Sequence, residues 1–320
     1  MKNTFCATFT TATVLLAPAL FGGVFDDAIW MMQPEDRNGN GIIDSGETVN
    51  WLKGGDLADN THKCTVYGYN DNRKMEQVTI DSRYLSGYTT TAMLITDANT
   101  QVKDGKTYYY PGAIVMNTAV PGLIDTTATS FSAIVRCCPQ DANSNTRWAL
   151  QCGNNGNRGF TLGFVGNHVR VYSDGDKGNV ASGKSYIGAL PVTANEWVDL
   201  GITVSWKPEL VDGALVTTGR LHVVLAKVGS DKLLTDDSFV NHNMIPDSST
   251  VRIGVETAVT SETTTAPNAK RFKGHIHQVA LWNRALTDDE FAEAFKFAAP
   301  THSLVGRNDG TANEFTRLRA

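Results

Sequence analysis

The sequence has few cysteines, little helical periodicity and no excess of basic charge over its 320 residues. The net charge of −5 argues against general nucleic-acid binding, because such proteins need a broad basic face. The scarcity of long helical patterns argues against a helix bundle. Glycine, in contrast, is abundant at 29 residues, and threonine recurs along the chain. This composition predicts an all-β protein with many turns.

Only one long apolar run is present, and it lies at the N-terminus. Residues 7–21 are mostly apolar, follow the positive charge of Lys2 and are too short to span a bilayer comfortably. Small residues at Ala17-Pro18-Ala19 suit a cleavage site. The sequence therefore predicts a signal peptide over residues 1–19 of a secreted protein, extracellular or periplasmic. No transmembrane segment is expected after its removal. The alternative is a retained N-terminal anchor.

Five cysteines are present, and Cys6 would leave with the signal peptide. Cys64, Cys137, Cys138 and Cys152 remain, an even number that suits an oxidising compartment. Three pairings of these four are possible. We favour a Cys137–Cys152 disulfide, because both residues lie in phase with the apolar positions of their predicted strands. A zinc site is disfavoured, since the chain has no Cys-x-x-Cys spacing.

Short alternating segments separated by turn residues recur between residues 61 and 300. The clearest is residues 197–206, in which Val198, Leu200, Ile202, Val204 and Trp206 alternate with small or polar residues. The dipeptide Asp212-Gly213 is typical of a tight hairpin turn. Many short strands at such spacing predict a β-sandwich or jelly roll.

The segment 274–296 predicts a strand, a turn and a capped helix. In the strand, simple alternation places Ile276, Ala280 and Trp282 on one face. His275 and His277 share the other face, where a structural role is favoured over a metal site. After the strand, Thr287 and Glu290 have the spacing of a capping box, and Phe291 and Phe295 give the helix one apolar face.

This closing segment, Gly274-His275-Ile276 with Leu281-Trp282-Asn283-Arg284-Ala285-Leu286-Thr287, resembles the end of laminin-G-like, concanavalin-A-like jelly-roll domains. Ser130-Phe131-Ser132-Ala133 and Asn195-Glu196-Trp197-Val198 are similar to two further strands of that family. The resemblance covers residues 110–297. It implies a jelly-roll sandwich over 61–300, a capping helix and a glycan- or protein-binding function. A leader over 24–60 precedes the sandwich, and a tail over 301–320 follows it.

The leader contains a twelve-residue segment, 36–47, with the pattern of an EF-hand calcium loop. Calcium prefers six to eight oxygen ligands in a flexible shell. Side-chain oxygens stand at positions 1, 3, 5, 9 and 12, the carbonyl of position 7 completes the set, and Gly41 permits the sharp turn at position 6. The predicted ligands of a structural Ca²⁺ are Asp36, Asn38, Asn40, Ile42, Asp44 and Glu47. Ile43 is the apolar residue expected to pack the loop inward. The alternative is an Asn- and Gly-rich turn without an ion.

The chain contains no Gly-x-Ser-x-Gly elbow, His-Glu-x-x-His motif, P-loop or strand with the paired carboxylates of glycosidases on this fold. We therefore expect a non-catalytic module that binds a polysaccharide or a cell-surface glycan. Tyr108, Tyr109 and Tyr110 are candidates for a sugar platform. The alternatives are an adhesive surface protein that binds protein partners and a divergent carbohydrate-active enzyme.

Overall fold

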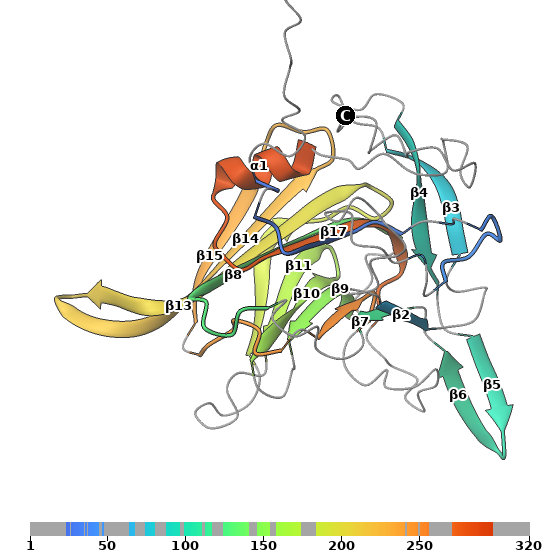
Figure 1. The fold of residues 1–320 in the computed structure, drawn as a ribbon, viewed down its shortest axis with the longest axis horizontal. Coiled ribbons are helices and arrows are strands. Elements are labelled where there is room, and N and C mark those ends of the chain that lie inside the picture. The colour runs from blue at the N-terminus through green and yellow to red at the C-terminus, as the bar shows by residue number, and fades with distance from the viewer. Residues whose placement is uncertain are drawn as a thin grey trace, which may run out of the picture.

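The computed structural model describes residues 24–25, 27–34, 36, 38–44, 47, 64–67, 74–80, 88–96, 99–110, 113–116, 124–140, 146–153, 158–173, 184–240, 242–248, 250–255 and 271–296. This part of the chain forms two antiparallel sheets, packed as a β-sandwich, and one helix (Figure 1). The predicted all-β sandwich with a capping helix is confirmed. The predicted signal peptide (1–19) and tail (301–320) lie outside the described residues.

The larger sheet, sheet A, has eight strands. They are β1 (Trp30–Met32), β3 (Lys74–Ile80), β4 (Tyr88–Ile95), β8 (Ser130–Pro139), β13 (Val198–Val211), β14 (Ala214–Lys227), β15 (Leu234–Val240) and β17 (Gly274–Trp282). Their order is β15-β14-β13-β8-β17-β4-β3, and β1 also pairs with β17. The segment expected as a leader thus contributes a strand to the sandwich.

Sheet B has seven strands. They are β2 (Cys64–Tyr67), β7 (Ala113–Met116), β9 (Thr146–Gly153), β10 (Gly159–Val165), β11 (His168–Ser173), β12 (Lys184–Pro191) and β16 (Val251–Ile253). Their order is β12-β11-β10-β9-β16-β7-β2. A separate two-stranded sheet, β5 (Asn99–Lys103) with β6 (Lys106–Tyr110), projects from the sandwich (Figure 1).

The main core lies between the two sheets and follows the alternation of the strands. From sheet A it takes Val198, Leu200, Ile202 and Val204, as the sequence predicts. From sheet B it takes the apolar positions Phe160, Leu162, Phe164, Val169, Val171, Leu150, Val251 and Ile253. The alternate residues of each strand consequently face outward, away from the opposite sheet.

The faces predicted for β17 are partly wrong, because a β-bulge interrupts the strand. The register against β8 shifts between Ile276 and Gln278. Ile276 therefore faces the main core together with Val279 and Leu281, whereas Ala280 and Trp282 belong to a second apolar cluster on the opposite face. Simple alternation cannot reveal the extra residue.

Helix α1 (Asp288–Lys296) covers the outer face of sheet A (Figure 1). It begins with the predicted capping box: Thr287 N donates to Glu290 Oε2 at 2.8 Å, and Glu290 N donates to Thr287 Oγ1 at 3.3 Å. Phe291 and Phe295 pack with Trp282 in the second cluster. A glycine is required below the helix, because a Cβ on Gly201 would lie 2.5 Å from the Phe291 ring.

The ends of β13 and β14 form a hairpin arm beyond the neighbouring strands, residues 206–218 (Figure 1). Asp212 and Gly213 have φ angles of 50° and 81°, as the predicted tight turn requires. Near the turn, Leu210 and Leu215 pair across the arm and are 74% and 73% exposed.

Within the described residues, no helix is long and apolar enough to cross a membrane.

Candidate functional site

A buried ion pair joins β8 to β13 beneath α1. Arg136 Nε donates to Asp199 Oδ1 at 2.8 Å, and Arg136 Nη2 donates to Asp199 Oδ2 at 3.0 Å. Nη2 also donates to the carbonyl oxygen of Phe295, near the end of α1, at 2.6 Å. Arg136 and Asp199 are direct neighbours in the β8–β13 register and are 1% and 2% exposed. The pair therefore ties two strands and the helix together.

Both carboxylate oxygens of Asp199 are occupied by this pair. Burial raises the pKa of Asp199 above its usual value, while the charge and hydrogen bonds of Arg136 oppose that shift. A carboxylate held in a two-point contact with a guanidinium is poorly placed to exchange a proton with a substrate. Asp199 thus acts as an anchor for Arg136 and not as a catalytic acid.

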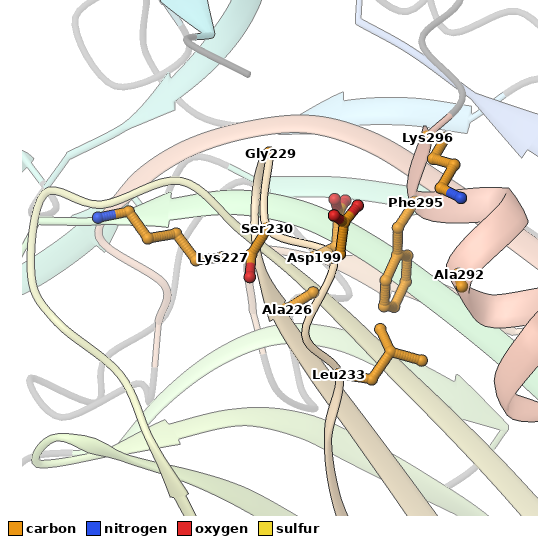
Figure 2. Close-up of a pocket in the computed structure, with 10 residues that line it drawn as sticks. Asp199, Ala226, Lys227, Gly229, Ser230, Leu233, Ala292, Phe295 and Lys296 are labelled. Carbon is orange, nitrogen blue, oxygen red and sulfur yellow. The ribbon is translucent and has the colours of Figure 1, made fainter. Parts of the chain in front are cut away.

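A cavity of about 250 Å³ opens beside this pair, between α1 and the turn that joins β14 to β15. Figure 2 shows the Phe295 ring beside the helix, with Leu233 below the ring and Lys227 extending away. Lys227 Nζ instead donates to Glu196 at 2.7 Å. The cavity is lined by Asp199, Ala226, Lys227, Gly229, Ser230, Asp231, Leu233, Ala292, Phe295 and Lys296.

The lining of this cavity is two-sided. Phe295, Leu233 and Ala292 form an apolar wall, whereas Ser230 and Asp231 bring a hydroxyl and a carboxylate on the exposed turn. Its volume lies just below the range of about 300–1,000 Å³ typical of ligand pockets. An apolar wall facing a few polar groups suits one small ring that carries hydroxyl groups on its edge.

The two histidines of β17 pack against one aromatic side chain, Trp197. The His275 ring centroid lies 6.0 Å from that of Trp197, and the His277 ring meets Trp197 edge-on at 6.4 Å. His275 Nε2 is 2.9 Å from Glu76 Oε2. His277 is fully buried, and its pKa is lowered well below the usual value by burial and by the positive charge of Arg136. This packing supports the structural role favoured for both histidines.

Acid should destabilise the fold through His277. In the unfolded chain this imidazole takes up a proton near pH 6.5, whereas the folded protein keeps it neutral to a much lower pH. The free energy of unfolding therefore decreases as the pH falls below about 6.5, by up to about 1.4 kcal/mol per pH unit. Urea unfolding of the wild type and of His277→Gln between pH 7 and pH 5 measures this slope. The slope should be smaller in His277→Gln, and an unchanged slope would contradict the assignment. His168→Gln is the matched control.

The described residues of the segment 36–47, which are 36, 38–44 and 47, are held together by hydrogen bonds to its acidic side chains. Asp36 Oδ1 accepts hydrogen bonds from the N–H groups of Gly39 and Asn40, and Asp36 Oδ2 accepts from Gly41. Asp44 Oδ2 accepts from the side-chain amides of Asn38 and Asn40, at 3.0 and 2.9 Å. The side chains at positions 1, 3, 5 and 9 therefore converge within one loop.

Glu47 completes the loop from position 12. Its Oε1 accepts from Asn38 N at 3.0 Å, its Oε2 accepts from Asp44 N at 2.9 Å, and it is only 5% exposed. The loop is also held by the sandwich: Ile43 lies fully buried in the main core, and Met75 N of β3 donates to the Gly41 carbonyl at 2.9 Å. The predicted inward packing of Ile43 is confirmed.

The donor set of this loop fits calcium better than a transition metal. Among the described residues, no group of three or more His, Cys, Asp or Glu side chains is arranged to hold an ion by itself. An EF-hand site also uses Asn side-chain and backbone carbonyl oxygens, which this loop supplies at Asn38, Asn40 and Ile42. Such an all-oxygen set is typical of hard cations.

The predicted disulfide between Cys137 and Cys152 is not formed. Both side chains face the main core, as their phase predicted, but Cys137 lies on β8 of sheet A and Cys152 on β9 of sheet B. Alternation predicts that both side chains face inward, but it does not predict that their Cβ atoms come within bridging distance. Cys64 and Cys138 are also buried and form no disulfide, and burial together with Glu196 raises the pKa of Cys138 to about 11.

The tyrosine triplet lies in a strand and not in a loop. Tyr108, Tyr109 and Tyr110 form the end of β6 and pair with Gln101, Thr100 and Asn99 of β5. Their side chains lie outside the described part of the structure, so the sugar platform stays a prediction. The cavity beside Asp199 was missed. The sequence around Asp199 gives no sign of it, because its partner Arg136 is 63 residues away.

No family model matches the chain, and no curated protein matches it. Three similar solved structures are a botulinum neurotoxin serotype C1 binding domain, a botulinum neurotoxin type G receptor binding domain and the CBM40 of a Ruminococcus gnavus IT-sialidase bound to α2,3 sialyllactose.

The identities are 13%, 11% and 11%, and the TM-scores are 0.48, 0.46 and 0.39. The matches cover 85%, 84% and 64% of this chain and 52%, 51% and 95% of the others. The chain thus spans about half the length of the two toxin chains. Likeness of this size identifies neither a family nor a ligand for this chain.

Proposed function

We propose that this protein is a secreted, non-catalytic module that binds a polysaccharide or a cell-surface glycan. The observation that carries the proposal is the cavity between α1 and the β14–β15 turn, with its apolar wall and polar rim. A sugar ring presents C–H groups on its faces and hydroxyl groups around its edge. Phe295 and Leu233 suit the first, and Ser230 and Asp231 suit the second.

The non-catalytic part of the proposal rests on the carboxylates of the cavity. Glycoside hydrolysis requires two carboxyl groups free to act as acid and as base or nucleophile. Asp199 and Asp231 line the cavity, but both oxygens of Asp199 are bound by Arg136. The carboxylate of Asp231 alone does not supply the pair of groups that this reaction needs.

Calcium is the cofactor that we propose. Asp36, Asn38, Asn40, Asp44 and Glu47 would supply side-chain oxygens and Ile42 its carbonyl. The fixation of the loop to β3 and to the main core supports a structural role, in which calcium holds the segment 36–47 against the sandwich. The laminin-G-like, concanavalin-A-like type of this sandwich is likewise a proposal, supported by the two antiparallel sheets and the capped closing helix.

Filling the cavity tests the glycan proposal. Leu233→Trp adds bulk inside the cavity, whereas Leu210→Trp adds the same bulk at the exposed tip of the hairpin arm. Affinity for the best-retained glycan of a broad panel is measured by titration calorimetry. Leu233→Trp should weaken binding by about tenfold or more, the loss of roughly 1.4 kcal/mol, and Leu210→Trp should not. Lys296→Ala provides a milder second variant, and equal affinity in all four proteins would refute the assignment of the cavity.

The sequence also leaves two alternative functions. An adhesive surface protein would bind cells or proteins in a way that free sugar does not compete, and the exposed Leu210 and Leu215 favour this alternative. A divergent carbohydrate-active enzyme would release new reducing ends, lost when one acidic residue is replaced.

A further inference from the structure

The strands of sheet B contain no acidic residue, although the whole chain has a net charge of −5. Basic and imidazole side chains occur on four of them, at Arg147, His168, Arg170, Lys184 and Arg252. The strands of sheet A, in contrast, include acidic residues such as Glu76 and Asp199. The charge carried by the strands of sheet B is therefore positive, whereas that of the whole chain is negative.

The outer face of sheet B carries a continuous row of polar side chains. The strand registers place Arg252 of β16 beside Gln151 of β9, Gln151 beside Thr161 of β10, and Thr161 beside Tyr172 of β11. Each of these residues alternates with side chains that enter the main core, so the row points away from sheet A. Amide, hydroxyl and guanidinium groups thus stand side by side across four strands.

Arg252 is the unusual member of this row. Its Nε and Nη1 atoms are buried and, among the described residues, meet no hydrogen-bond acceptor. Burial lowers the pKa of its guanidinium. A buried charged donor without an acceptor is costly, and native structures rarely keep one without a reason. An anion bound at this position would supply the missing acceptors.

Next to this row lies an aromatic cluster on the same face. The Arg170 guanidinium carbon lies 5.5 Å from the centroid of the Trp148 ring, and the Tyr172 ring lies 6.2 Å from that ring. Trp148 is fully buried, whereas Arg170 and Tyr172 are half-buried. Arg170 and the aromatic side chain of Trp148 therefore lie beside the row.

We propose that the outer face of sheet B binds an oxyanion at Arg252, carried by the acidic sugar units of the glycan. This deepens the proposed glycan binding and rests on it. A guanidinium fork matches the planar geometry of a carboxylate and also accepts a sulfate group. Gln151 and Thr161 lie fully buried beside it, and Tyr172 at the far end of the row is half-buried. The ligand class is a uronic-acid or sulfated glycan.

The first test uses free anions on the full chain. Sodium glucuronate and sodium sulfate are titrated against wild type, Arg252→Gln and Lys207→Gln, with sodium chloride at matched ionic strength as reference. Arg252→Gln should weaken anion binding by about tenfold or more, as the loss of a charged hydrogen bond implies. Lys207→Gln removes the same charge from the exposed hairpin arm and should bind as the wild type does. Equal binding by wild type and Arg252→Gln would overturn the proposal.

Stability provides a second measurement that does not depend on binding. In chloride alone, Arg252→Gln should melt no lower than the wild type, because the buried unpaired charge is removed. Glucuronate or sulfate should raise the melting temperature of the wild type by more than that of Arg252→Gln, in which only the general stabilising effect of the salt remains. An Arg252→Gln protein that melts well below wild type in chloride would show that Arg252 has a protein partner, and would overturn the proposal.

The source of the anion is then separated with polysaccharides. Polygalacturonate, dextran sulfate and neutral dextran distinguish a uronate ligand from a sulfated one and both from a neutral glycan. Preferential retention on one acidic polymer, lost in Arg252→Gln, supports the proposal and identifies the source. Retention on neutral glycans alone, unchanged in Arg252→Gln, leaves glycan binding standing and overturns the anion site. Free-anion binding at Arg252 without retention on any glycan supports the anion site and refutes the proposed function.

Discussion

Arg136→Met is expected to destabilise the protein by about 3–5 kcal/mol, because it leaves the buried carboxylate of Asp199 without its partner. The same change removes the hydrogen bond from Arg136 to the Phe295 carbonyl, so the end of α1 also loses an attachment to β8. Urea or guanidinium unfolding at pH 7 measures the loss. Most of this decrease in the free energy of unfolding comes from burying a charge without a partner. The net stabilisation by the intact ion pair is smaller.

That distinction can be tested with a double variant. Arg136→Met combined with Asp199→Leu removes both charges and keeps the site filled with apolar atoms. Buried ion pairs replaced in this way often leave stability unchanged or raise it by about 1–4 kcal/mol, so the double variant should be clearly more stable than Arg136→Met. A double variant as unstable as the single one, or an Arg136→Met loss below about 1 kcal/mol, would show that the pair does not hold α1 on the sheet.

Removal of calcium is expected to lower the free energy of unfolding by about 2.7 kcal/mol when the ion is present at 100 times its dissociation constant. The reason is that the loop 36–47 is attached to β3 and buries Ile43 in the main core, so the ion stabilises the sandwich itself. The measurement is thermal and urea unfolding in calcium and in EGTA. Direct titration of calcium into the EGTA-treated, dialysed protein gives the affinity.

Two variants of the loop make this result specific. Asp36→Asn and Glu47→Gln keep the shape of the side chains but remove charge at positions 1 and 12, and both should abolish the difference between calcium and EGTA. Asp212→Asn makes the same chemical change in the exposed turn of the hairpin arm and should leave that difference intact. If wild type unfolds identically in calcium and in EGTA, the loop is a turn without an ion.

The features that could be predicted from the sequence are those with local causes. The alternation of Val198 to Val204 predicted a strand with one buried face, because one sheet face is covered by the main core. The Thr287–Glu290 capping box was confirmed in both hydrogen bonds, because its partners lie within one helical turn. The packing of Ile43 likewise followed from its place in the loop.

The features that the sequence could not show depend on pairing between distant segments. The bulge at Ile276–Gln278 is defined only against β8, and it moved Ile276 to the face opposite the one predicted. The cysteine prediction lacked the assignment of the two strands to different sheets. Arg136 and Asp199 are 63 residues apart and meet only because β8 and β13 are neighbours, so the cavity beside them had no local signal.

The most direct test of the proposed function is one experiment on the full-length protein with a broad panel of polysaccharides. Protein retained on each glycan and reducing ends released from each glycan are measured together, in calcium and in EGTA. We expect retention on at least one glycan, competed by free sugar, with no release of reducing ends, and weaker retention in EGTA as the sandwich loses stability. Released reducing ends would contradict the non-catalytic assignment, and the absence of retention on every glycan would contradict glycan binding.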